Sequence, residues 1–390
     1  MAGQPGVRKP LAVTSDESCS SSLVELEPNT LLARSPRLRL GGFFTGPIVS
    51  PDGRLAAVGS ASEPQIVVAR TERLDRVATI RLGTQYAGTR VIAWPAQRRL
   101  VALVVRSDAH RVGLTDVVVV DPDGEQVLAR APFGWWASMG EGVTAGGRVA
   151  VLLVPWTHRG VPRLVVVGSD GRLRGVRLKL LSAGVGYGRH GEVVDFPALA
   201  VDRRGETAHV VTGRQPLASV DLRTLSVRYR SIRGLMQPSP SEFGRPYETG
   251  TDNPEQGTRR VAEWLGPGAI AVSGEDLRWA PEHHEASAPA GLQVLDLRTR
   301  RARSVRRAVR ELQLAGGRLL ARDRGLIAFD RRGREVYRFG TSDAWWHVAF
   351  ARVYIDLPGS RRAAVLDARS GRTIGRIPQA RVSALVGWGC

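Results

Sequence analysis

The sequence predicts an all-β protein built from repeated antiparallel sheets, and three observations support this. Short apolar runs rich in valine recur along the whole chain. Polar tight turns containing Asp, Gly, Arg or Thr separate these runs. No stretch of about twelve residues carries apolar side chains at the period of an α-helix. Short valine-rich runs bounded by turn residues are typical of β-strands.

One type of hairpin recurs about every 49 residues. Each copy has an apolar run, a polar tight turn and a second alternating run. Asp at the first turn position can accept hydrogen bonds from the following backbone, and Gly tolerates the positive φ that a tight hairpin requires. The hairpins span 23–31, 66–80, 117–129, 164–176, 217–229, 292–305, 326–339 and 363–377.

A second type of hairpin fills the gaps between the first. Its copies span 50–60, 93–105, 143–154, 199–211, 263–273, 312–322 and 348–357. Each period therefore contains four short strands. Four antiparallel strands in about 40–50 residues, repeated around a ring, predict a single β-propeller with four-stranded blades. A solenoid of parallel strands would give shorter repeats.

The strand count predicts eight blades, with seven as the alternative. The hairpin at 23–31 has no inner strands of its own, and the stretch 380–390 has a strand pattern with no hairpin after it. We therefore expect the N- and C-terminal strands to complete one composite blade. The propeller would span 21–390, after a flexible segment at 1–20. A long inserted loop at 234–258 would be either a lid over the channel mouth or a mobile insertion.

Two motifs resemble those of the bacterial WD-repeat-like, YVTN and TolB-like β-propellers. They are SPDGRLAAVG at 50–59 and the turns that begin at Asp221, Asp296 and Asp367. The resemblance implies a ring-shaped protein that binds a partner or ligand, although some similar families are lyases or hydrolases. The Gly-His and Trp-Asp dipeptides of true WD repeats are absent, which argues against a eukaryotic-style scaffold role.

The net charge is +19, and 54 of the 56 basic residues are arginine. Such a skew is typical of GC-rich coding bias, so the charge alone does not indicate a polyanionic partner. One dense cluster is either a solvated strand face or a polyanion site. It comprises Arg300, Arg301, Arg303, Arg306, Arg307 and Arg310. No aromatic residues interleave with it, which disfavours nucleic acid as the partner.

Aromatic and histidine residues gather in the long connections, which propeller geometry brings to one face. Exposed aromatic residues around one mouth would form a binding surface. The candidates are Tyr86, Trp135, Trp136, Tyr187, His190, Phe243, Tyr247, Trp345, Trp346 and His347. The alternative for the two Trp-Trp pairs is packing between adjacent blades.

Signatures of an enzyme or a cofactor site are weak. The stretch 186–191 matches G-x-G-x-x-G, but a strand pattern follows it rather than the helix that holds a pyrophosphate. His283 and His284 are weak metal-ligand candidates, because adjacent histidines chelate one tetrahedral ion poorly. We therefore expect no cofactor. A non-catalytic binding protein is favoured over a lyase or hydrolase with a His or metal site at the channel mouth.

The two cysteines, Cys19 and Cys390, lie near opposite ends of the chain. A closed ring would bring them together, either as a disulfide or as two free thiols. The first residues lack the apolar core of a signal peptide, so the compartment stays open: the protein is cytoplasmic, or extracytoplasmic if its targeting segment is missing from this sequence. No apolar run reaches the roughly 18 residues of a membrane-spanning helix. We expect a monomer that binds a protein or a small molecule.

Overall fold

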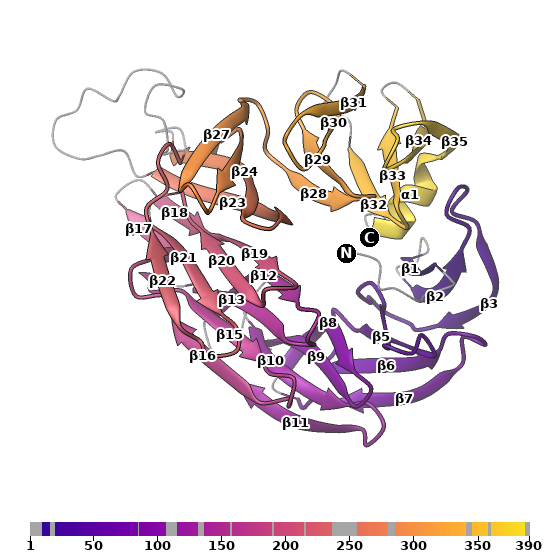
Figure 1. Cartoon of the computed structure of the whole chain (residues 1–390). Helices are drawn as coiled ribbons and strands as arrows, with labels where there is room; N and C mark the ends of the chain where they lie inside the picture. The colour runs from indigo at the N-terminus through magenta and orange to yellow at the C-terminus, as the bar shows by residue number, and fades with distance from the viewer. Residues whose placement is uncertain are drawn as a thin grey trace.

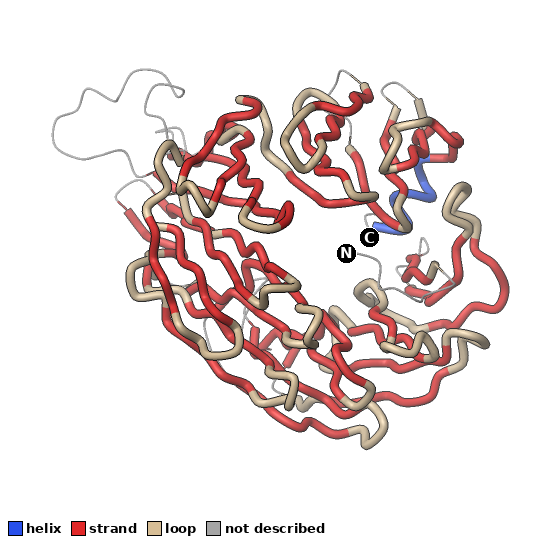
Figure 2. The backbone as a smooth tube through the Cα atoms, viewed as in Figure 1, coloured by secondary structure: helices blue, strands red, loops and turns tan. Residues whose placement is uncertain are grey.

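The structure is a computed structural model that describes residues 10–15, 20–84, 86–106, 115–131, 136–156, 158–188, 191–213, 216–235, 256–279, 285–340, 345–357 and 360–386. Within these residues the regular secondary structure is β-strand joined by turns and loops, with one short helix, as Figure 2 shows. The all-β prediction is confirmed. No helix in this part of the chain is long and apolar enough to cross a membrane.

Seven four-stranded antiparallel blades stand around a common axis (Figure 1). Blade 1 contains β4 (Ile48–Val49), β5 (Leu55–Gly59), β6 (Gln65–Arg70) and β7 (Arg76–Arg81). Blade 2 contains β8 (Tyr86–Ala96), β9 (Arg99–Arg106), β10 (Thr115–Asp121) and β11 (Gln126–Ala131). Blade 3 contains β12 (Trp136–Val143), β13 (Val149–Pro155), β15 (Arg163–Val167) and β16 (Leu173–Arg177). Blade 4 contains β19 (Ala198–Asp202), β20 (Thr207–Val211), β21 (Leu217–Asp221) and β22 (Val227–Arg230).

The second half of the ring follows the same plan. Blade 5 contains β23 (Gln256–Gly266), β24 (Ala269–Trp279), β26 (Leu292–Asp296) and β27 (Arg301–Arg306). Blade 6 contains β28 (Leu312–Ala315), β29 (Arg318–Arg322), β30 (Leu326–Phe329) and β31 (Glu335–Phe339). Blade 7 contains β32 (Trp346–Ala349), β33 (Arg352–Asp356), β34 (Arg362–Asp367) and β35 (Thr373–Pro378).

The core lies between the blades rather than inside one layer. In β10, Val117 and Val119 pack between blades 2 and 3, whereas Val118 and Val120 pack between blades 1 and 2. Successive side chains of a strand point to opposite faces, so a strand with a neighbouring sheet on each side needs apolar residues at every position. This explains the continuous valine runs in the sequence.

A three-stranded sheet stands between blade 7 and blade 1. It contains β1 (Leu11–Ser15), β2 (Ser21–Leu26) and β3 (Ala33–Arg39). One face packs against blade 1 through Leu23, and the other packs against blade 7 through Val24. The ring therefore has seven four-stranded blades, the alternative count, and this N-terminal sheet in an eighth position. Its strand β1 lies within the stretch 1–20, for which the sequence predicted a flexible segment.

The C-terminal segment joins the N-terminal sheet, but not as a strand. Residues Gln379–Val386 form helix α1, which packs against β1 and also contacts β34 and β35. The prediction that a C-terminal strand completes a composite blade is therefore wrong for the described residues. The segment follows Pro378 and contains Gln, Ala, Arg and Leu, which have favourable helix propensities. Val382 contributes to the cluster that contains Leu26 and Leu31.

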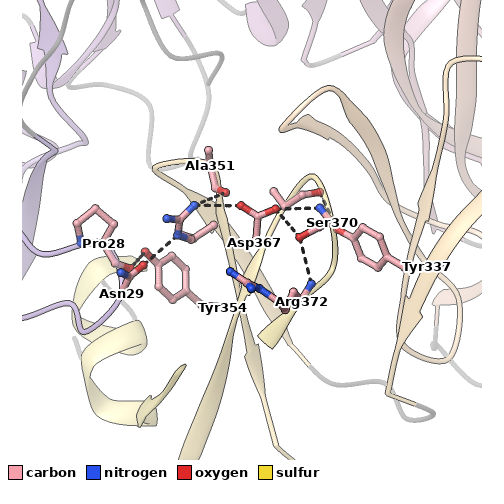
Figure 3. Close-up of polar contacts among 10 residues, drawn as sticks. Pro28, Asn29, Tyr337, Ala351, Tyr354, Asp367, Ser370 and Arg372 are labelled. Atoms are coloured by element: carbon pink, nitrogen blue, oxygen red, sulfur yellow. Dashed lines mark hydrogen bonds and ion pairs between the residues drawn. The ribbon is translucent and has the colours of Figure 1, made fainter. Parts of the chain in front are cut away.

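Hydrogen bonds to a single turn close the ring at the seam, which we define as the junction of blade 7 and α1 with the N-terminal sheet (Figure 3). The Tyr354 hydroxyl donates to the Pro28 carbonyl oxygen at 2.6 Å. The Nε of Arg352 donates to Oδ1 of Asn29 at 3.0 Å. A guanidinium nitrogen of Arg381 donates to the Thr30 carbonyl oxygen at 3.0 Å. The three acceptors lie in the turn between β2 and β3.

A further set of strands extends blade 5 sideways. It contains β14 (Arg159–Gly160), β17 (Ala183–Gly188), β18 (Gly191–Phe196) and β25 (Glu285–Pro289). The hairpin of β17 and β18 belongs to the connection from blade 3 to blade 4, yet β18 pairs in parallel with the start of β23 in blade 5. The described part of this connection therefore forms strands and pairs with blade 5 rather than only with the two blades that it joins.

Candidate functional site

The strand order assigns each connection to one face of the ring. Tight turns join the first strand to the second and the third to the fourth within each blade, and we call their side the turn face. The connections from one blade to the next lie on the opposite side of the ring. The connections that join the second strand of a blade to its third strand lie on that side as well. We call that side the loop face. It carries the bridging strands β14, β17, β18 and β25.

A hollow of about 520 Å³ opens on the loop face between blades 5 and 6. One wall is formed by residues 304–308, at the end of β27 and in the connection that follows it. The other wall is formed by Asp323 and Arg324, in the turn between β29 and β30. The hollow forms where these two kinds of loop-face connection from neighbouring blades meet.

The charge in this hollow is only partly compensated. Asp323 is 5% exposed and forms an ion pair with Arg306. Arg307 and Arg324 are exposed, and neither has an ion-pair partner among the residues that the structure describes. A buried carboxylate fixes one guanidinium, while two further guanidinium groups face solvent in a concave surface. This arrangement suits an anionic group, because guanidinium can donate two parallel hydrogen bonds to an oxyanion.

Arg324 has an unusual backbone conformation. Its φ is +45°, in the left-handed region that residues with a side chain seldom adopt. The next residue, Gly325, has φ +130°, and a Cβ there would lie 2.5 Å from the Gly340 carbonyl oxygen. The backbone amide of Asp323 donates to the Gly325 carbonyl oxygen at 3.0 Å and holds the turn. Residues held in such conformations cluster at ligand sites.

An exposed tryptophan lies next to the hollow. Arg322, the residue before Asp323, has its guanidinium carbon 5.0 Å from the ring centroid of Trp345. A guanidinium nitrogen of Arg322 also pairs with Glu311 at 2.9 Å. Trp345 is 53% exposed, so much of the indole remains open to solvent. The loop face between blades 5 and 7 thus combines arginines with one accessible aromatic ring.

The other described aromatic candidates are largely enclosed. Trp136 packs against the cluster between blades 2 and 3, and Trp346 packs between blades 6 and 7. Tyr86 is 4% exposed, and its hydroxyl donates to Oδ2 of Asp116 at 2.8 Å. His347 lies on β32, where burial lowers its pKa. Among the aromatic and histidine candidates whose side chains are described, only Trp345 presents a large exposed surface.

Several predicted residues lie outside the described part. They are Cys19, Trp135, His190, Phe243, Tyr247, His283, His284 and Cys390, and most of the inserted loop at 234–258 lies outside it as well. Tyr187 is placed on β17, without a description of its side chain. The ligand roles of these residues therefore stay predictions. Strand β18 begins at the last residue of the glycine-rich stretch 186–191, so a strand follows this stretch, as its sequence pattern indicated.

The predicted arginine cluster is divided between the two faces. Arg300 lies in the tight turn before β27, on the turn face, and Arg301 starts the strand. Arg303 donates to the carbonyl oxygen of Arg332 in the next blade. At the other end of β27, Arg306 and Arg307 line the hollow. Arg310, nearby on the loop face, pairs with Glu275 at 3.3 Å.

Sequence reasoning missed the second wall of the hollow, Asp323 and Arg324. A signal was present, because the stretch Asp323-Arg324-Gly325 separates two apolar runs as a turn with Gly at its end. The sequence could not show that this turn meets the end of β27, since the two segments belong to different blades. Among the described residues, no three His, Cys, Asp or Glu side chains lie close enough together to hold a metal ion.

Comparisons with known proteins show the fold. No protein-family model matches this sequence, and no curated protein matches it. The dihydro-heme d1 dehydrogenase NirN, solved in complex with DHE, superposes with a TM-score of 0.55 and 13% identity, over 96% of this chain and 77% of that chain. Apo AztD from Citrobacter koseri superposes with a TM-score of 0.50 and 11% identity, over 95% of this chain and 94% of that chain. At these identities the likeness shows the β-propeller fold alone.

Proposed function

We propose that this propeller is a non-catalytic binding protein that holds an anionic ligand in the loop-face hollow between blades 5 and 6. The observation that carries the proposal is the pair of exposed guanidinium groups, Arg307 and Arg324, on opposite walls of one concave surface. The buried carboxylate of Asp323 pairs with Arg306, and both residues line the same hollow. If the arginines at the end of β27 were only a solvated strand face, they would not need the buried carboxylate of Asp323 beside them.

The chemistry of the walls selects a compact ligand with at least two negative charges. Phosphate and carboxylate groups accept paired hydrogen bonds from guanidinium groups. The net charge of +19 would also speed the encounter with an anion. An apolar or sugar ring attached to the charged group could stack on Trp345, because large aromatic rings anchor such ligands.

Titration calorimetry with pyrophosphate at low salt tests the proposal. We expect saturable binding to the wild type and at least a tenfold loss of affinity in the double variant Arg307→Gln with Arg324→Gln. We also expect affinity to fall as salt rises, because dissolved ions screen the attraction between the guanidinium groups and the anion. The matched control carries Arg76→Gln and Arg81→Gln, two exposed arginines on the outer strand of blade 1.

The control variant has the same net charge as the site variant but an intact hollow. It should bind pyrophosphate like the wild type. Equal weakening in both variants would mean that only the overall charge attracts the ion. That result, or the absence of binding to the wild type, would overturn the proposal.

A further inference from the structure

A second cleft lies at the seam, far along the chain from the loop-face hollow. It has a volume of about 270 Å³, and β1, β2, β3 and α1 all contribute to its walls. The chain thus brings residues from its two ends to one small cavity. The described residues around it are of two kinds, apolar side chains such as Leu26 and Leu31, and a polar set of hydroxyl and guanidinium groups.

The polar set has the chemistry of an oxyanion site. Hydroxyl groups come from Thr14, Ser20 and Ser22, and guanidinium groups come from Arg37 and Arg381. All of these groups can donate hydrogen bonds. No carboxylate lines the cleft among the described residues. Two positive charges with nearby hydroxyl donors therefore favour an anion.

Two described acids, on β2 and in the turn after it, pair with an arginine outside the cleft. Glu25 and Glu27 both pair with Arg34, with a distance of 3.3 Å for the Glu25 pair. Arg37 has no ion-pair partner among the residues that the structure describes, and its side chain is exposed. A charged ligand would supply the partner that Arg37 lacks.

Arg381 lines the cleft and also makes one of the hydrogen bonds that close the ring. It lies in α1, and one guanidinium nitrogen donates to the Thr30 carbonyl oxygen in the turn between β2 and β3. An anion held by Arg381 and by Arg37 on β3 would therefore join the C-terminal helix to the N-terminal sheet. This junction is closed elsewhere by packing and by a few hydrogen bonds.

We propose that a small oxyanion of the phosphate or sulfate class binds in the seam cleft and stabilises the closed ring. The site is distinct from the loop-face hollow and does not depend on the function proposed there. Because the ligand contacts both chain ends only when they are together, it binds the closed ring in preference to the open chain. Its binding should raise the melting temperature.

Thermal unfolding with increasing inorganic phosphate, against sodium chloride at matched ionic strength, tests the inference. We expect the wild-type Tm to rise by about 2–4 °C in a saturable way at millimolar phosphate. In Arg37→Gln the half-maximal concentration should rise at least tenfold. Arg37 makes no described contact to α1 or blade 7, so this variant should fold. sn-Glycerol 3-phosphate as a second probe distinguishes a free ion from a phosphoryl group on a larger molecule.

Two controls separate the cleft from other effects. Phosphate stabilises many proteins weakly by exclusion from their surfaces, and Arg37→Gln retains that effect. The variant with Arg307→Gln and Arg324→Gln lacks the loop-face cations but keeps the cleft, so it should show the full wild-type shift. Equal shifts in the wild type and Arg37→Gln would overturn the inference. Loss of the shift in the loop-face variant, or no shift beyond chloride in the wild type, would also overturn it.

Discussion

The hydroxyl of Tyr354 in blade 7 donates a 2.6 Å hydrogen bond to the carbonyl oxygen of Pro28, in the turn between β2 and β3 (Figure 3). These residues are 326 positions apart in the sequence. Burial raises the pKa of Tyr354, so the hydroxyl keeps its proton as a donor over the neutral and mildly basic range. The bond joins the last blade to the N-terminal sheet, two parts of the ring that are not consecutive in the sequence.

Tyr354→Phe should lower the free energy of unfolding by about 1–2 kcal/mol, because it leaves a carbonyl oxygen without its partner. Tyr337→Phe is the matched control, since the Tyr337 hydroxyl donates to the Ala368 carbonyl oxygen at 2.8 Å across blades 6 and 7. If the ring opens first at the seam, Tyr354→Phe will accelerate unfolding in denaturant more than Tyr337→Phe does. Equal unfolding rates would show that the seam is no weaker than other blade junctions.

Asp221→Ala should destabilise the propeller by about 1 kcal/mol through loss of turn hydrogen bonds. Oδ1 of Asp221 accepts from the backbone amides of Arg223 and Thr224, each at 2.8 Å. Asp221→Asn should cost less, because its amide oxygen can still accept them. Chemical denaturation of both variants measures the difference, and equal losses would contradict the capping role.

Acid should weaken the same turn. The backbone hydrogen bond from Thr224 holds the pKa of Asp221 below its ordinary value. The ionised side chain therefore contributes stability above its unfolded pKa near 3.8, and this is lost as pH falls through the lower folded pKa. Comparing wild type with Asp221→Ala across this range should show the stability difference shrinking toward low pH.

Gly371→Ala should destabilise the junction of blades 6 and 7. Gly371 has φ +71°, and a Cβ there would lie 2.4 Å from the Tyr337 ring. Gly268→Ala is a control with φ +75° and no atom within 4 Å of the new Cβ. The control isolates the conformational cost, about 1–2 kcal/mol. Gly371→Ala should cost a further 1–3 kcal/mol or so from overpacking. Similar melting temperatures for the two variants would show that Tyr337 moves aside freely.

Burial of His209 makes stability depend on pH. Burial lowers its pKa from 6.5 to about 4, its ring stacks on Trp264, and its Nδ1 lies 2.9 Å from the Ser219 hydroxyl. The unfolded chain takes up this proton at higher pH than the folded protein. The contribution of His209 to stability is therefore fully present above pH 6.5 and falls by about 3 kcal/mol as pH drops toward 4.

His209→Gln removes that titration, so its stability should change much less between pH 7 and pH 4. Some slope should remain, because burial also lowers the pKa of His347. Denaturant midpoints measured across this range provide the test. Parallel curves for the variant and the wild type would contradict the account of His209.

The repeat in the sequence predicted the architecture well, because blade strands are local and their turns carry their own chemistry. Asp296 shows this, since its Oδ1 accepts from the amides of Arg298 and Thr299, the role that the turn pattern indicated. The C-terminal segment could not be predicted in the same way. Its apolar residues Val382 and Leu385 fit either a short strand or a helical turn, and packing on β1 decides the outcome.

The candidate site was only half predictable for a related reason. Arg306 and Arg307 were visible as part of a dense arginine cluster. Their separation from Arg300 and Arg301 depends on the length of β27, which carries them to the opposite face. The sequence also could not show which tryptophan of the Trp345-Trp346 pair is exposed. Successive side chains point in opposite directions, so Trp345 is open to solvent whereas Trp346 packs between blades 6 and 7.

A crystal structure of the protein grown with pyrophosphate tests most directly whether the loop-face hollow binds anions. The account predicts a pyrophosphate between the two walls, with its oxygens accepting hydrogen bonds from both Arg307 and Arg324 and with Asp323 still paired to Arg306. A pyrophosphate bound only at another surface, or a hollow that contains water alone at saturating pyrophosphate, would contradict it.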